Sequence, residues 1–231
     1  MIGLWKGLRA QFDRATTLLY ITHRLLEKCS GGRAGLVPYL LYAQPLGQLG
    51  NAALASVKDD PQTQIALWPA GDARVAAFPR PPEVMAERWA SGSRCYGAVV
   101  KGEVAGCIWI ALNEHLEDEV RCRYQLPQDG VWDYDVLVLP RWRLGRTLAR
   151  LWKAVDADLA AEQRRWSFSR ISRFNRASIG AHERLGARVV GSATFLKLGS
   201  WQLSWQGAAL LPHWDGRSGC PTLTLHAPST P

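Results

Sequence analysis

The sequence predicts a mixed α/β fold, in which helices flank a central sheet and an amphipathic helix precedes it. Three observations support this class. Apolar residues keep helical spacing near the N-terminus, strand-like segments crowd residues 96–139, and a long amphipathic helix pattern follows Pro140. With 231 residues, 47% hydrophobic and 21% charged, the chain has the length and composition of one ordinary globular domain.

We expect three parts: an N-terminal helical extension over residues 1–35, a main domain over residues 36–206 and a loosely structured tail over residues 207–231. In the extension, residues 3–28 predict one amphipathic helix, which a pair of glycines ends. Such a helix docks most often on its own protein or on a second subunit, so a homodimer is one expectation and a membrane surface the alternative. The tail is rich in Pro, Gly and Ser, as loosely held chain ends often are.

The other elements follow from local periodicity and from turn residues. Strands are predicted over residues 36–44, 96–100, 104–112, 120–126, 131–139, 166–172, 188–198 and 201–205, and helices over residues 83–90, 143–163 and 176–185. Gly102 suits the tight turn of an antiparallel hairpin. The stretch before Pro82 gives no clear pattern. Glu114, His115 and Glu117 are expected in a solvated loop.

The composition argues against several classes of protein. No apolar run approaches the roughly 18 to 20 residues of a membrane span, and charged residues interrupt any N-terminal signal, so we expect a cytoplasmic protein. The five cysteines include no CxxC pair. We therefore expect free, mostly buried thiols and no metal site.

The positive charge is concentrated in one segment. Residues 141–188 hold twelve Arg or Lys against four acidic residues, whereas the rest of the chain holds sixteen of each sign. Such a segment indicates a polyanionic partner, which is either a phosphorylated small molecule or carrier, or a nucleic acid. A solvated helix face is the alternative interpretation.

Three local patterns carry a family resemblance. Residues 99–106 read VVKGEVAG, a turn before a strand that begins with a small apolar residue and glycine. Residues 138–143 read VLPRWR, a strand, a proline and an aromatic-Arg pair. Residues 175–187 read NRASIGAHERLGA, with Asn-x-x-Ser followed by a Glu-Arg-Leu-Gly run. Together with the element order, they resemble the GNAT (Gcn5-related N-acetyltransferase) superfamily, best over residues 96–195.

The resemblance implies a mostly antiparallel sheet and an acyl-CoA donor, most simply acetyl-CoA, with no metal. It places the donor's phosphates at the start of the helix after Pro140, where unpaired backbone N–H groups and a partial positive charge favour anions. The donor-binding residues that it implies are Leu137, Val138, Leu139, Arg143, Leu144, Gly145, Arg146, Thr147, Asn175 and Ser178.

The donor loop departs from the family pattern, in which Arg or Gln is followed by two small residues. A gapless alignment puts Arg146 and Leu148 at the small positions, and a one-residue gap puts Gly145 and Thr147 there but loses Arg143 as the leading residue. The loop is degenerate in either alignment. Arginine side chains can partly replace the glycine cradle through charge-assisted hydrogen bonds to phosphate.

The reaction implied is direct attack of an acceptor amine or hydroxyl on the thioester. His182 matches the position of the family's acid, and a histidine has a pKa of ~6.5, near neutrality. Period-two alternation puts Asp133 and Asp135 on one face of their strand, which makes either a candidate base. The alternatives are a solvated histidine and carboxylates that pair with nearby arginines.

The function predicted is transfer of acetyl from acetyl-CoA to an unknown small-molecule or sugar acceptor. A longer acyl-CoA or an acyl carrier protein is a possible donor, and a catalytically silent scaffold of the same fold is a further alternative. Nucleic-acid binding accounts for the charge but not for the pattern over residues 175–187, and so ranks lower.

Overall fold

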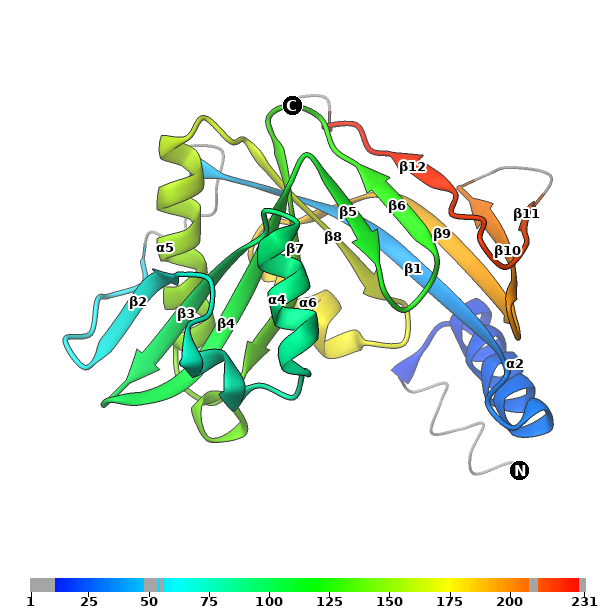
Figure 1. Ribbon diagram of the computed structural model, residues 1–231, viewed down its shortest axis with the longest axis horizontal. Coiled ribbons are helices and arrows are strands. Elements are labelled where there is room, and N and C mark those ends of the chain that lie inside the picture. The colour runs from blue at the N-terminus through cyan, green and yellow to red at the C-terminus, as the bar shows by residue number, and fades with distance from the viewer. Residues whose placement is uncertain (1–10, 48–53, 55, 208–211, 229–231) are drawn as a thin grey trace. The chain divides into compact units, whose positions relative to one another are not determined.

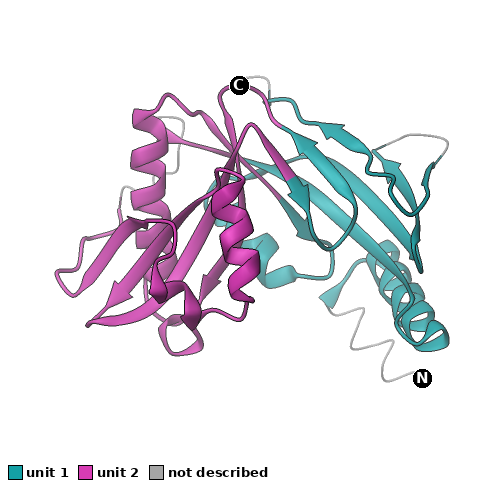
Figure 2. Cartoon of the chain, in the orientation of Figure 1, with its two compact units in different colours: residues 1–43, 116–125, 170–231 teal, residues 44–115, 126–169 magenta. Residues whose placement is uncertain are grey.

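The computed structural model describes residues 11–47, 54, 56–207 and 212–228 of the chain (Figure 1). Within these residues the fold is mixed α/β, with a mostly antiparallel sheet flanked by helices, as the sequence predicts. The chain forms two compact units (Figure 2): unit 1 is residues 1–43, 116–125 and 170–231, and unit 2 is residues 44–115 and 126–169. These units do not follow the predicted division at residues 35 and 206, which stays a prediction.

Unit 2 contains the strands that lead to the predicted donor loop. Its strands are β2 (Thr63–Trp68), β3 (Arg94–Val100), β4 (Glu103–Leu112), β7 (Gly130–Val138) and the first part of β8 (Trp166–Ser172), in the order β2-β3-β4-β7-β8. All neighbours are antiparallel except β7 and β8, which are parallel. Its helices are η2 (Ala73–Ala77), α4 (Pro82–Ala90), η3 (Pro140–Trp142) and α5 (Thr147–Ala161).

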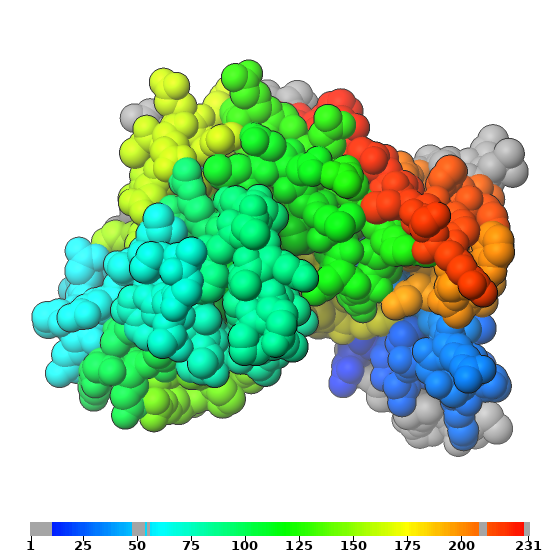
Figure 3. Space-filling view, in the orientation of Figure 1, coloured from blue at the N-terminus to red at the C-terminus, as the bar shows by residue number. Residues whose placement is uncertain are grey.

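Two layers of side chains cover the strands of unit 2. Helix α5 packs along β2, β3 and β4, and it buries the apolar face that its periodicity predicts, with Leu151, Trp152, Val155 and Leu159 fully inaccessible. A separate cluster joins Val75, Phe78 and Met85 of the η2–α4 region to strand residues. In the space-filling view, η2 and α4 cover the near side of unit 2 (Figure 3).

The hairpin of β3 and β4 forms as predicted, and Gly102 in its turn has φ +80°. Strand β2, which the sequence did not reveal, pairs with β3 at the sheet edge. The ring of Trp68 lies on the backbone of Gly97, where an added Cβ would stand 1.9 Å from a ring atom. This cross-strand contact fixes the small residue at that position.

Among the described residues, unit 1 contains two sets of strands and two helices. Its elements are α2 (Arg14–Ser30), most of β1 (Ala34–Pro45), the end of β5 (Glu114–Glu117), β6 (Cys122–Gln125), α6 (Arg176–Arg184), β9 (Arg188–Leu198), β10 (Trp201–Gln206), β11 (His213–Asp215) and β12 (Thr222–Thr224). Strands β1, β9, β10 and β11 pair antiparallel in that order. Strand β12 pairs parallel with β6.

The predicted N-terminal helix over residues 3–28 needs correction. Helix α2 starts at Arg14, because the Asp13 carboxylate accepts a hydrogen bond from the Thr16 backbone N–H at 2.9 Å and so caps a new helix there. The helix ends at Gly31, whose φ of +61° forms a left-handed cap, as the glycine pair predicts. Residues 3–10 of the predicted helix lie outside the described residues.

Two segments expected to lack regular structure contain strands. In the predicted tail, residues 213–215 and 222–224 form β11 and β12, since each finds a partner strand elsewhere in unit 1. Residues 114–117 form β5 instead of a solvated loop, and Glu117 is buried because Arg170 binds it at 2.7 Å. These pairings depend on contacts that are distant in sequence.

Candidate functional site

A β-bulge interrupts β7 just before the predicted donor loop. Trp109 of β4 pairs with Tyr134, but Cys107 pairs with Leu137, so Asp135 and Val136 stand opposite the single residue Ile108. Asp135 has φ +44°, a left-handed conformation that is uncommon for a residue other than glycine. The extra residue takes part of the backbone of β7 out of the ladder with β4.

The prediction that Asp133 and Asp135 lie on one face of their strand is wrong, because the bulge interrupts the alternation of the strand. Tyr134 and Leu137, three residues apart, both pack in the cluster of Cys107 and Trp109, so the alternation of β7 reverses between them. Asp135 binds Arg88, whose guanidinium lies 4.9 Å from the centre of the Tyr134 ring. Asp133 pairs in register with Ile110 and faces the other side.

The two carboxylates therefore have different surroundings. Asp133 is only 2% exposed, and the Ser167 hydroxyl donates a hydrogen bond of 2.6 Å to it. Asp135 accepts two hydrogen bonds of 2.8 Å from Arg80 and forms an ion pair of 2.8 Å with Arg88. Burial alone would raise the pKa of Asp135, but the two arginines outweigh it, and the pKa is lowered from its usual value of 3.8.

Gly106 allows the bulged strand to lie close to β4. A Cβ at this position would stand 2.6 Å from the backbone oxygen of Leu137, a distance that no side chain tolerates. Beyond it, the Leu139 N–H donates to the Ala105 carbonyl at 2.8 Å and extends the ladder towards the donor loop. Gly106, the last residue of the pattern VVKGEVAG, thus has a packing reason in this chain.

On its other side, β7 is paired along only part of its length. Within the described residues, the register with β8 covers Gly130–Trp132, opposite Trp166–Phe168. From Asp133 to Val138, the pairing of β7 is with β4 alone. The second half of β7, which contains the bulge and the predicted donor residues Leu137 and Val138, therefore has backbone groups available on its β8 side.

The strand leads through η3 into the start of α5, where the helix has no side-chain cap. Arg146 occupies the N-cap position without a capping hydrogen bond, and no acidic residue lies in the first turn. The first N–H groups of a helix have no partner within it, and together they carry a partial positive charge. This helix end, with Arg141, Arg143 and Arg146 exposed before it, is suited to an anion.

The side chains of the donor loop are turned in different directions. Arg143 donates to the Val138 carbonyl at 2.9 Å, and Arg141 forms an ion pair with Glu103. Leu144 is fully exposed. At Gly145 an added Cβ would meet its nearest atoms at 3.5 and 3.8 Å, which is ordinary contact, so nothing in the protein itself requires glycine there.

The second predicted signature begins α6 in unit 1. The Asn175 side chain accepts a hydrogen bond of 3.0 Å from the Ser178 N–H, which confirms its capping role. His182 is 8% exposed, and its Nδ1 lies 2.9 Å from the Ser178 carbonyl oxygen. That Asn175, Ser178 and His182 border the same donor as the loop of unit 2 stays a prediction.

Arg80 and Arg88 are the site residues that the sequence did not reveal. Arg80 precedes α4 and ends the stretch without a clear pattern, and Arg88 lies on the predicted helix over residues 83–90 without any motif around it. Only a prediction of the bulge could have pointed to them, since it is the bulge that turns Asp135 towards α4.

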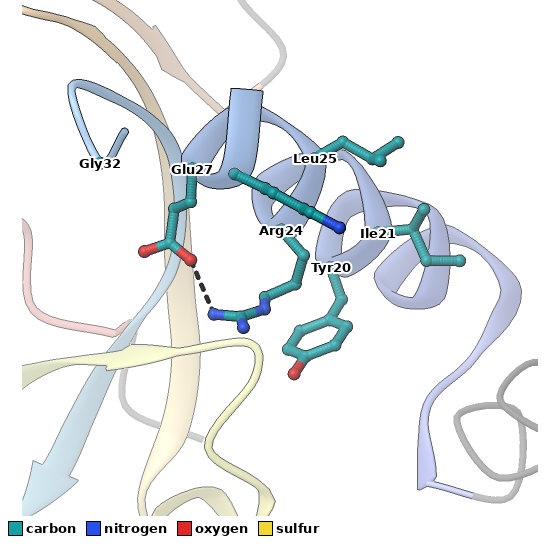
Figure 4. Close-up of a pocket in the computed structure, with 7 residues that line it drawn as sticks. Tyr20, Ile21, Arg24, Leu25, Glu27 and Gly32 are labelled. Atoms are coloured by element: carbon teal, nitrogen blue, oxygen red, sulfur yellow. Dashed lines mark hydrogen bonds and ion pairs between the residues drawn. The ribbon is translucent and has the colours of Figure 1, made fainter. Parts of the chain in front are cut away.

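Two other kinds of site are absent from the described residues. Among the described residues, no group of His, Cys, Asp or Glu could hold a metal ion, and no helix is long and apolar enough to cross a membrane. The five cysteines are free, and three of them are buried. A surface hollow on α2 is lined by Tyr20, Ile21, Arg24 and their neighbours (Figure 4), and it includes none of the predicted site residues.

Solved structures supply the comparisons for this fold. No protein-family model and no curated protein matches the chain. A conserved protein of unknown function from Staphylococcus epidermidis superposes with a TM-score of 0.51 at 15% identity, covering 81% of this chain and 68% of that one. A GNAT-family protein from Novosphingobium aromaticivorans gives 0.49 at 21% identity, covering 69% and 62%. A tandem GNAT protein of clavulanic acid biosynthesis gives 0.46 at 15%, covering 79% and 57%.

The order of elements agrees with the one that the sequence patterns imply. From β3 to β10 the chain forms a hairpin, the short strands β5 and β6, the strand β7, the long helix α5, a strand parallel to β7, the short helix α6 and two further strands. The chain shares its mixed α/β fold with the Staphylococcus epidermidis protein. In the fold that the sequence resemblance implies, the bulged strand and the start of α5 are the predicted donor-binding elements. The chain covers less than two thirds of the length of the Novosphingobium protein.

The ionised state of Asp135 gives a prediction for stability. Because the pKa of Asp135 is lowered by folding, its contribution is complete above about pH 4 and is lost as the pH falls through the lower pKa of the folded state. We expect Asp135→Asn to lower the free energy of unfolding by about 2 kcal/mol at pH 7. In urea unfolding, this difference should shrink below pH 4, and an equal difference at pH 7 and pH 3 would contradict the assignment.

Proposed function

We propose that the chain is an acyltransferase that takes an acetyl group from acetyl-CoA and passes it to an amine or hydroxyl acceptor. The observation that supports this best is the uncapped start of α5, which directly follows a bulged strand and carries exposed arginines. An activated acyl carrier has a polyanionic end and a thioester end. The start of α5 suits the polyanionic end, and the free edge of β7 suits the thioester end.

The phosphates of the donor would bind at the first turn of α5. The N–H groups of Thr147 and Leu148 lie in that turn, and Gly145 leaves room beside it. Exposed Arg146 adds charge-assisted hydrogen bonds, as does Arg143 once it leaves the Val138 carbonyl. Arginine charge thus supplies part of the affinity that a glycine-rich loop obtains from backbone N–H groups alone.

The thioester would lie along the second half of β7, beside Leu137, Val138 and Leu139. Acyl transfer places negative charge on the carbonyl oxygen, and fixed N–H donors stabilise that charge. The bulge supplies backbone groups that are outside the ladder with β4, at the point where pairing with β8 has also ended. Such groups are held in place by the sheet, so they need no reorganisation during the reaction.

In the chemical step, the acceptor nitrogen or oxygen forms a bond to the carbonyl carbon as the carbon–sulfur bond breaks. The acceptor loses one proton to a base, and the sulfur gains one from an acid. Of the two predicted bases, Asp135 has both carboxylate oxygens bound by Arg80 and Arg88. We therefore assign the base to Asp133, acting through water.

His182 is assigned the acid. A carbonyl oxygen only accepts hydrogen bonds, so the 2.9 Å contact with Ser178 requires the proton on Nδ1 and leaves Nε2 of the neutral ring without one. The ring can thus donate from Nε2 only as imidazolium. This assignment depends on α6 meeting the donor's sulfur.

The acid has a direct test in turnover. We expect His182→Phe to lower kcat about 100-fold at saturating acetyl-CoA, a typical contribution of one acid. His213→Phe, at an exposed position in β11, is the matched control and should leave kcat unchanged. Full turnover by His182→Phe would remove the residue from the mechanism.

Donor binding is the test of the proposal as a whole. Because a ligand that binds only the folded state stabilises it by about 2.7 kcal/mol at 100 times its Kd, CoA and acetyl-CoA should raise the thermal midpoint measurably. Arg146→Gln should weaken CoA binding about tenfold, whereas Arg33→Gln, an exposed arginine of unit 1, should not.

Two alternatives make different predictions in the same experiment. A silent scaffold is favoured by the single glycine of the donor loop, and it would show no shift with CoA, acetyl-CoA, longer acyl-CoAs or an acylated carrier protein. A nucleic-acid binder would instead show affinity for polynucleotide that falls steeply with salt. Either result would replace the acyltransferase.

A further inference from the structure

The bulge of β7 is held by an ion-pair cluster of Arg80, Asp135 and Arg88. Nε and Nη2 of Arg80 donate to the two carboxylate oxygens of Asp135 at 2.8 Å each, and Nη2 of Arg88 lies 2.8 Å from Oδ2. Both oxygens of the one bulge residue are therefore fixed. The arginines come from two places in the chain, the segment before α4 and α4 itself.

Arg88 is rigid because its surroundings leave it little freedom. Its side chain is 9% exposed, and its guanidinium lies over the rings of Trp109 at 5.3 Å and Tyr134 at 4.9 Å. Trp109 pairs with Tyr134 across β4 and β7 at the last position before the bulge. The guanidinium of Arg88 thus packs on two rings of the regular ladder and binds the carboxylate of the bulge residue Asp135.

The backbone at Asp135 needs such support. A φ of +44° is strained for a residue with a side chain, and strained backbone persists where the surroundings over-determine it. The contacts of the carboxylate oppose relaxation of this residue, and the Asp135 carbonyl also lies 3.9 Å from the Cys107 thiol. Loss of the ion pairs would free the bulge without removing any of the apolar cluster around it.

We propose that Arg80 and Arg88 are positioning residues, which fix Asp135 and thereby the direction of the bulge's backbone groups towards the thioester carbonyl. This inference rests on the proposed acyltransferase function. It implies that the η2–α4 region, through its two arginines, determines how well the protein distinguishes an acyl thioester from the free thiol. The phosphate end of the donor should be indifferent to the cluster.

The experiment compares CoA with acetyl-CoA, which differ only in the acyl group. By calorimetry, wild-type protein should bind both, and Asp135→Asn should keep its Kd for CoA within about twofold while losing about tenfold in affinity for acetyl-CoA, the equivalent of one hydrogen bond. In turnover, kcat should fall about tenfold or more, with a smaller change in KM for the acceptor. Arg88→Lys keeps the charge but not the planar fork, so its affinity for acetyl-CoA and its kcat should lie between those of the wild type and those of Asp135→Asn.

Glu162→Gln is the matched control, because it removes an exposed ion pair with Arg94 in the same unit, at 2.6 Å. It should change neither the ratio of the two Kd values nor kcat. If Asp135→Asn fails to fold, Arg80→Gln decides instead, since it leaves the Arg88 pair in place and should reduce the same ratio.

Two outcomes would overturn the inference. A folded Asp135→Asn or Arg80→Gln variant with the wild-type ratio of Kd values and the wild-type kcat would show that the cluster serves stability alone. If wild-type protein binds neither CoA nor acetyl-CoA, the proposed function fails, and the inference that rests on it fails with it.

Discussion

One extra residue in β7 governs the arrangement of the candidate site. Because Asp135 and Val136 stand opposite Ile108 alone, the strand's alternation reverses, and Asp133 and Asp135 face opposite sides of the sheet. The same irregularity takes backbone groups out of the ladder, at the point where pairing with β8 has ended. Within the described residues, a strand that was regular throughout would still pair with β8 only as far as Trp132, but it would turn Asp135 away from the arginine that now binds it.

The predicted donor loop carries arginines where the family pattern that it resembles has small residues. In this chain the start of α5 keeps the general properties of a helix end, which are unpaired N–H groups and a partial positive charge, and adds exposed arginines. Gly145 has no packing partner that requires it, in contrast to Gly97 and Gly106, where a Cβ would overlap a ring and a backbone oxygen. A glycine that no neighbouring atom of the protein requires leaves room for the approach of a ligand.

Much of the local structure could be predicted from the sequence, because its causes are local. The face of α5, the turn at Gly102 and the cap at Asn175 each depend on residues within a few positions. The bulge, strand β2 and strands β11 and β12 depend on partners distant in the chain, and period-two alternation contains no sign of them. For the same reason Arg80 and Arg88 could not be predicted as part of the site.

The central claim is that the start of α5 holds the anionic arm of an activated acyl carrier. Amide chemical shifts from nitrogen-15-labelled protein report on this directly, because the N–H groups that bind phosphate are themselves observed. Titration with CoA should move the amide signals of Gly145 to Ala149 most strongly, and inorganic pyrophosphate should move them in the same direction with lower affinity. Unchanged signals over these residues, with CoA in excess, would contradict the account.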